Sequence, residues 1–207
     1  MDLKAWIGHF WPIGLSLVVP ILLGLGLLLG RHYTFAPIEV TADQPDYVQI
    51  QGIPYFVQHD PQWAGQRLGG SQETLAEAGC TLVCVAMALH RLGFDWTPSQ
   101  LCQRLKTAGG FTKRGHLIWK ELGTVTDGRV KVRFPLLSHT QIGRELAAGR
   151  PVIAKILLSG SVQHWVLIIG QEGPNYWALD PLSRDWEPVQ LSILSQKIYA
   201  IRVLEKA

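Results

Sequence analysis

Cysteine is scarce in this 207-residue chain, and its three positions exclude two common structural roles. Three cysteines are too few for a disulfide scaffold, and none belongs to a Cys-x-x-Cys pair. Cys80 and Cys84 lack nearby histidine or carboxylate partners in the order of a structural zinc site. The sequence therefore predicts neither a disulfide framework nor a zinc centre. A Cys84–Cys102 disulfide stays open if the domain lies outside the cytoplasm.

The chain also lacks the charge patterns of two large protein classes. Its formal net charge is only +3, and lysine and arginine form no cluster, so no nucleic-acid-binding surface is expected. A glycine-rich phosphate loop is absent, which excludes an ATP-driven transporter. Neither a nucleic-acid partner nor a cofactor is therefore predicted.

One long uncharged stretch is present near the N-terminus, from Phe10 to Gly30. Its length matches a single crossing of the hydrocarbon core of a bilayer. Trp6, Trp11 and Tyr33 flank it, as aromatic residues do at membrane interfaces. A cleaved secretory signal is the alternative, but the run exceeds a typical signal core and no small-residue cleavage motif follows it. We therefore predict an uncleaved membrane anchor over residues 1–30.

Two further segments follow the anchor. Residues 31–49 contain Pro37 and Pro45 and are predicted to form a linker, and residues 50–207 are predicted to form the folded domain. The basic groups on the two sides of the anchor nearly balance, so they define its orientation only weakly. We expect a single-pass membrane protein whose C-terminal domain is extracytoplasmic.

Helical patterns dominate the first half of the folded domain, and strand patterns dominate the second half. Helices are expected at 80–92, 98–106, 115–122 and 139–148, and strands at 50–57, 130–134, 152–158, 164–170, 175–180 and 197–204. Helices followed by an antiparallel meander indicate an α+β fold.

The apolar stretch from Cys80 to Leu89 is the centre of the predicted fold. It carries no charge, and Gly93 follows as a natural end, which is typical of a buried helix. Cys80 then lies in the first turn, where free backbone N–H groups and the helix dipole favour a thiolate. The alternative is a cysteine that only packs in the core, as most unselected free cysteines do.

A histidine and an aspartate in the predicted meander are candidate partners for that thiol. A loop centred on residues 171–175 places His164 and Asp180 on one face of a hairpin, opposite each other or one diagonal step apart. An aspartate there would orient the imidazole and leave its other nitrogen for a thiol. Taken alone, His164 could be a strand histidine and Asp180 a turn residue. With Cys80 upstream, the three form a candidate catalytic set.

Six stretches resemble the bacteriocin-processing, double-glycine leader peptidases, and more closely their stand-alone relatives within the papain-like cysteine peptidase superfamily. They are IPYFVQHDPQWA (53–64), LGGSQETLAEAGCTLVCVAMAL (68–89), TPSQL to GGF (97–111), AAGRPVIAKI (147–156), HWVLIIG (164–170) and ALDP (178–181). The resemblance covers residues 50–204 and implies N-terminal helices packed on an antiparallel sheet. It makes Cys80 the nucleophile, His164 the general base and acid, and Asp180 the group that orients the histidine.

The same resemblance implies a glutamine upstream of the cysteine as an oxyanion donor. An amide N–H can join the backbone N–H of Cys80 around a developing negative charge. Gln58, in the PYFVQ stretch, matches the motif better, whereas Gln72 lies nearer to Cys80. We choose Gln58; the alternative is that both are ordinary exposed glutamines.

These observations predict a membrane-anchored thiol hydrolase, a cysteine peptidase that acts on a peptide or protein substrate. A catalytically silent peptide-binding domain and an acyltransferase on the same fold remain the alternatives. The leader peptidases usually belong to transporters that carry an ATPase, which this chain lacks. Cleavage after paired glycines is therefore not predicted for it.

Overall fold

Helix-capping residues set where the helices begin. The computed structural model describes residues 36–207, in which Thr74 and Thr97 each form a capping box with the residue three positions on. Ser138 accepts a hydrogen bond from the backbone of Gln141 at the start of a third helix. The helices are α2 (Leu75–Ala78), α3 (Cys80–His90), α4 (Pro98–Thr107), α5 (Glu121–Val125), α6 (His139–Ala147) and α7 (Leu191–Leu194). The expected helices at 80–92, 98–106 and 139–148 are thus confirmed.

The strands form one antiparallel sheet. They are β1 (Ile38–Glu39), β2 (Thr41–Gln49), β3 (Val130–Arg133), β4 (Val152–Leu158), β5 (Val162–Leu179), β6 (Val189–Gln190) and β7 (Lys197–Lys206). Their order is β1-β7-β4-β5-β2, with β3 paired to β7 and β6 paired to β5. An antiparallel sheet combined with helices makes the domain α+β, as expected.

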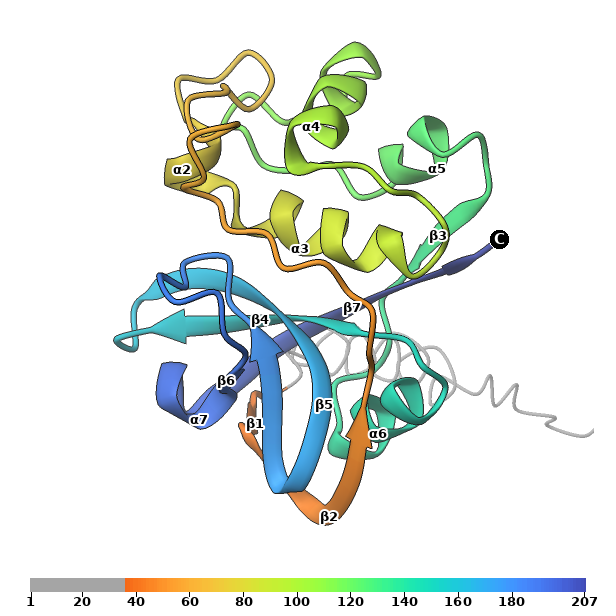
Figure 1. Cartoon of the computed structure of the whole chain (residues 1–207), viewed down its shortest axis with the longest axis vertical. Coiled ribbons are helices and arrows are strands. Elements are labelled where there is room, and N and C mark those ends of the chain that lie inside the picture. The colour runs from red at the N-terminus through yellow and green to blue at the C-terminus, as the bar shows by residue number, and fades with distance from the viewer. Residues whose placement is uncertain (1–35) are drawn as a thin grey trace, which may run out of the picture. The chain divides into compact units, whose positions relative to one another are not determined.

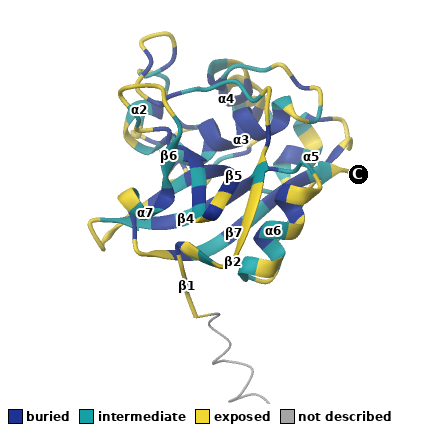
Figure 2. Ribbon diagram, turned by 60° about the horizontal axis from the view of Figure 1, so that its bottom comes forward, coloured by how far each residue is buried: buried dark blue, intermediate teal, exposed yellow. Residues whose placement is uncertain are grey.

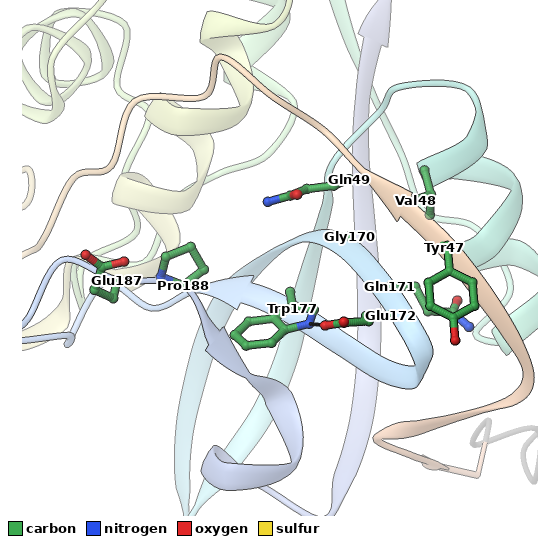
Figure 3. Close-up of a pocket in the computed structure, with 9 residues that line it drawn as sticks. All are labelled: Tyr47, Val48, Gln49, Gly170, Gln171, Glu172, Trp177, Glu187 and Pro188. Carbon is green, nitrogen blue, oxygen red and sulfur yellow. Dashed lines mark hydrogen bonds between the residues drawn. The ribbon is translucent and has the colours of Figure 1, made fainter.

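Strand β5 is a single element that reverses direction (Figures 1 and 3). Its first part pairs with β4, with His164 opposite Ile156, and its middle pairs with β2. If straight, its 18 residues would span about 60 Å. The side chains of His164, near its start, and Asp180, which directly follows its last residue, are instead 2.6 Å apart. The two strands expected at 164–170 and 175–180 therefore belong to one element that turns near Gly173, whose φ is 58°.

Each face of the sheet carries a hydrophobic core (Figure 2). Helix α3 covers one face with α4 packed on its outer side, and every residue of α3 from 82 to 89 is buried, as the uncharged sequence predicts. Helix α6 covers the other face, where Ile142 and Leu146 join the core that contains Val166 and Ile168 of β5. The helix that bears Cys80 is consequently fixed against the strand that bears His164.

The segment predicted as a linker contributes strands to the sheet. Residues 38–49 of the expected linker 31–49 form β1 and β2. The residues of β2 are largely exposed, so no alternating apolar pattern reveals the strand. Pairing with β5 through the backbone forms it, and a register shift between Thr41 and Asp46 accommodates Pro45.

Two of the elements expected from the sequence differ from those in the structure. Residues 50–57, expected as an edge strand, are extended but make no ladder; only the backbone N–H of Ile50 bonds to the sheet, and Gly52 leaves the extended region with a φ of 73°. The helix expected at 115–122 begins only at Glu121, because Leu117 and Ile118 pair through their backbones with Phe111 and Gly110 instead of forming a helical turn.

Within residues 36–207, no helix combines the length and apolarity that crossing a bilayer requires. The predicted anchor over residues 1–30 lies outside the described residues, as do residues 31–35. The membrane anchor therefore stays a prediction from the sequence.

Candidate active site

Cys80 lies at a tight joint between two helices. Helix α2 ends at Ala78, and α3 begins at Cys80 with Gly79 as the only residue between them. A Cβ atom at position 79 would overlap the carbonyl oxygen of Leu75, so the joint requires glycine. The joint places the thiol in the first turn of a buried helix, among backbone N–H groups that have no partner within the helix.

His164 and Asp180 form a buried pair. The His164 Nε2 lies 2.6 Å from the Asp180 Oδ1, and the two residues are only 2% and 6% exposed. The same Oδ1 accepts the backbone N–H of Leu182 at 2.9 Å, which fixes the carboxylate. Because Nε2 donates to Asp180, Nδ1 is the ring nitrogen left for the thiol.

The thiol and the imidazole change each other's acidity. Burial alone would raise the pKa of Cys80, but the hydrogen bond and the charge of His164 bring it below the ordinary thiol value. Burial alone would likewise lower the pKa of His164, but hydrogen bonds to Asp180 and Cys80 raise it to about 9. Both shifts favour a thiolate beside an imidazolium, which is the nucleophilic form.

The other two thiols, those of Cys84 and Cys102, have raised rather than lowered pKa values. Burial raises the pKa of Cys84 well above the usual thiol value, and the nearby negative charges of Cys80 and Asp180 raise it further. Burial also raises the pKa of Cys102. Both are free thiols that donate to backbone carbonyl groups, so the structure does not contain the disulfide that the sequence left open. Only Cys80 is activated.

The structure separates the two candidate oxyanion glutamines. Gln58 is 3% exposed, and its side chain lines the same pocket as Cys80 and His164. Its Nε2 donates to the Ala76 carbonyl oxygen at 2.5 Å, which uses one of its two N–H groups and leaves the other. Gln72 is exposed and lines a different hollow, so the structure brings Gln58 but not Gln72 to the thiol.

The pocket lined by Cys80, His164 and Gln58 has a volume of about 550 Å³, a size typical of ligand sites. Apolar side chains from several segments supply most of the remaining lining. They include Leu68, Phe111, Leu117, Trp119, Val162 and Leu182. The arrangement combines an activated thiol, a proton carrier and an amide donor in one cleft, which suits acyl transfer from an ester or amide.

A second pocket, of about 540 Å³, lies between β2, β5 and the segment before β6 (Figure 3). The Trp177 indole N–H donates to the carboxylate of Glu172 at 3.1 Å, and Glu187 lies on the far side of the pocket. None of the four predicted catalytic residues lines this pocket. Among residues 36–207, no group of three or more histidine, cysteine or carboxylate side chains is placed to hold a metal ion.

Sequence reasoning missed three groups at the site. The backbone of Trp165 and the side chain of Thr81 both help to lower the pKa of Cys80. Each adjoins a predicted catalytic residue, and that adjacency was the available signal. Tyr55 bonds to the backbone of Asp180 across 125 positions, and no sequence pattern links the two.

Comparison with known proteins gives two findings. The Peptidase C39-like family matches residues 50–200. A crystal structure of a candidate C39-like peptidase from Bacillus anthracis is similar with a TM-score of 0.55 and 14% sequence identity, covering 78% of this chain and 98% of that one. At that identity, the similarity shows the fold alone. No curated protein matches the chain.

Proposed function

The chain belongs to the Peptidase C39-like family, and we propose that it is a cysteine peptidase with a Cys80-His164-Asp180 triad. The observation that carries the proposal is the buried His164–Asp180 hydrogen bond of 2.6 Å beside a thiol of lowered pKa. The resemblance to bacteriocin-processing enzymes supports a peptide substrate, without a defined cleavage sequence.

Acylation begins with the Cys80 thiolate, which attacks the carbonyl carbon of the scissile peptide bond. The negative charge that develops on the carbonyl oxygen is stabilised by the backbone N–H of Cys80 and the free amide N–H of Gln58. The His164 imidazolium then donates its proton to the departing amine, and the C–N bond breaks. The products are a free amine and a thioester on Cys80.

Deacylation reuses the same groups. Neutral His164 takes a proton from water, and the resulting hydroxide attacks the thioester carbonyl carbon. The C–S bond breaks, the acid leaves, and Cys80 regains its thiolate beside the protonated imidazole. Asp180 keeps the imidazole oriented through both half-reactions and stabilises its positive charge.

The pH dependence of kcat/KM should follow the thiolate–imidazolium pair. Activity should rise as pH passes the lowered pKa of Cys80, because the thiol then ionises. It should fall as pH rises through about 9, because His164 then loses the proton that the leaving amine needs. The check is a steady-state profile on a peptide that the enzyme cleaves. A profile that keeps rising through the alkaline range would contradict the pair.

The variant Gln58→Ala should reduce kcat about 100-fold, because one of the two oxyanion donors is lost. KM should change much less, since the donor acts mainly on the transition state. Gln72→Ala is the matched control and should retain full activity, because Gln72 is exposed and lines a separate hollow. Equal losses in the two variants would exclude Gln58 as the oxyanion donor.

The proposed activity is tested by incubating the domain with a mixed peptide library and identifying new termini by mass spectrometry. Cleavage by the wild-type chain, absent with Cys80→Ala, supports the peptidase. Peptide retention without cleavage would favour the silent binding domain, and transfer of the acyl group to added amines would favour an acyltransferase.

We further propose that residues 1–30 anchor the domain, with the domain outside the cytoplasm. Support comes from the uncharged run between Phe10 and Gly30 and its aromatic flanks. The full chain should stay in the membrane fraction after an alkaline wash, and its domain should be cleaved by protease added outside intact cells. Recovery in the soluble fraction would refute the anchor.

A further inference from the structure

The Tyr55 hydroxyl is placed to hydrogen-bond to the backbone at both ends of the segment 180–187, which follows β5. The Tyr55 Oη accepts the backbone N–H of Asp180 at 3.1 Å. It also lies 3.2 Å from the carbonyl oxygens of Asp180 and Glu187, to which its single proton can be donated. The hydroxyl therefore ties the two ends of the segment 180–187 to each other.

A second contact comes from the same short segment. The backbone N–H of Gln58 donates to the carbonyl oxygen of Pro181 at 2.8 Å. Residues 55–58 thus bond to two consecutive residues, Asp180 and Pro181, and also supply the oxyanion amide. Phe56 of this segment is fixed in turn, because its backbone N–H lies 3.4 Å from the Met87 sulfur of α3.

We propose that Tyr55 is a positioning residue that holds the Asp180 carboxylate against His164. This proposal rests on the proposed peptidase activity. Asp180 follows the last residue of β5, so regular strand pairing does not fix its backbone. Its N–H group is instead held by Tyr55, and its C=O group accepts both the Tyr55 hydroxyl and the backbone N–H of Ser183, the latter at 2.9 Å. The ring of Tyr55 packs against the hydrophobic core that contains α3. Tyr55 does not line the catalytic pocket.

The consequence for catalysis runs through the carboxylate. Asp180 accepts from the His164 Nε2 at 2.6 Å, a distance that small backbone shifts would lengthen. Asp180 contributes to the pKa shifts of three titratable groups, which are His164, Tyr55 and Cys84. A weaker Asp180 contact lowers the pKa of His164, and with less imidazolium present the pKa of Cys80 rises. Loss of the Tyr55 hydroxyl should therefore narrow, from both sides, the pH range in which the thiolate and the imidazolium are present together.

The test compares two pH profiles in the wild-type chain and in Tyr55→Phe: the rate of Cys80 alkylation by iodoacetamide, which reports the thiolate, and kcat/KM for peptide cleavage, which also requires the imidazolium. The variant keeps the ring and removes only the hydroxyl. We expect the acid limb of both profiles to move up, and the alkaline limb of the cleavage profile to move down, by about half a pH unit each. We also expect kcat for peptide cleavage to fall about 10-fold, with KM little changed.

Tyr176→Phe is the matched control. The Tyr176 hydroxyl also makes a partly buried hydrogen bond, to His139 at 3.1 Å, but on the other face of the sheet. The Tyr176→Phe variant should lower the melting temperature without moving either limb of the pH profiles. If Tyr55→Phe lowers only the melting temperature and keeps the wild-type pH profile, the positioning role is wrong. If wild-type Cys80 shows no enhanced reactivity at all, the peptidase proposal itself fails, which is a distinguishable result.

Discussion

The Cys80→Ala variant should lose at least about 10⁴-fold in kcat for peptide cleavage, because no other group can form the acyl-enzyme. The fold should survive, since alanine fits the first turn of α3 and removes only one sulfur atom. Peptide hydrolysis assays under saturating substrate measure the loss, and far-UV circular dichroism checks the fold.

Cys102→Ala is the control for this loss. Cys102 is buried in α4, and its thiol donates only to the carbonyl oxygen of Arg67. Its replacement should lower the free energy of unfolding by about 1–2 kcal/mol and leave kcat unchanged. Residual cleavage by Cys80→Ala at more than about one per cent of the wild-type rate would remove Cys80 from the mechanism.

Replacing His164 by alanine should have the second largest effect. The Cys80 thiol would remain buried but would lose the imidazolium that lowers its pKa, so burial would dominate and the pKa would rise above the ordinary value. Near neutral pH, the rate of Cys80 alkylation should fall about 100-fold, and peptide cleavage should fall about 10⁴-fold because the proton donor is also lost.

His139→Ala provides the comparison, because His139 lies in α6 on the opposite face of the sheet. It should leave both the alkylation rate and peptide cleavage at wild-type values. An unchanged alkylation rate in His164→Ala would mean that the helix N-terminus alone activates the thiol. The imidazole would then have no role in forming the nucleophile.

The helical half of the fold could be predicted because its signals are local. Thr97 and Pro98 mark the start of α4, and an uncharged run marks the buried α3. Strand β2 could not be predicted, because its residues are mostly exposed and its pairing with β5 is a backbone interaction between segments far apart in the sequence. The composition of residues 31–49 suggested a linker, whereas residues 41–49 form β2, an edge strand of the sheet.

The candidate site was predictable to the extent that its residues carry chemistry. Cys80 and Gln58 could be chosen from motifs, and both line the same pocket as His164. The bonds that hold Asp180 were not predictable, because Tyr55 acts through backbone groups and carries no catalytic signature. Residues that position a site are found only when the chain's distant segments are seen together.

The most direct measurement compares the alkylation rates of the three cysteines in the folded wild-type chain at about pH 6, where ordinary thiols are almost fully protonated. Mass spectrometry of the digested protein gives the rate for each site. Cys80 should be modified at least about 100-fold faster than Cys84 or Cys102. Comparable rates at all three positions would contradict an activated nucleophile and, with it, the proposed peptidase.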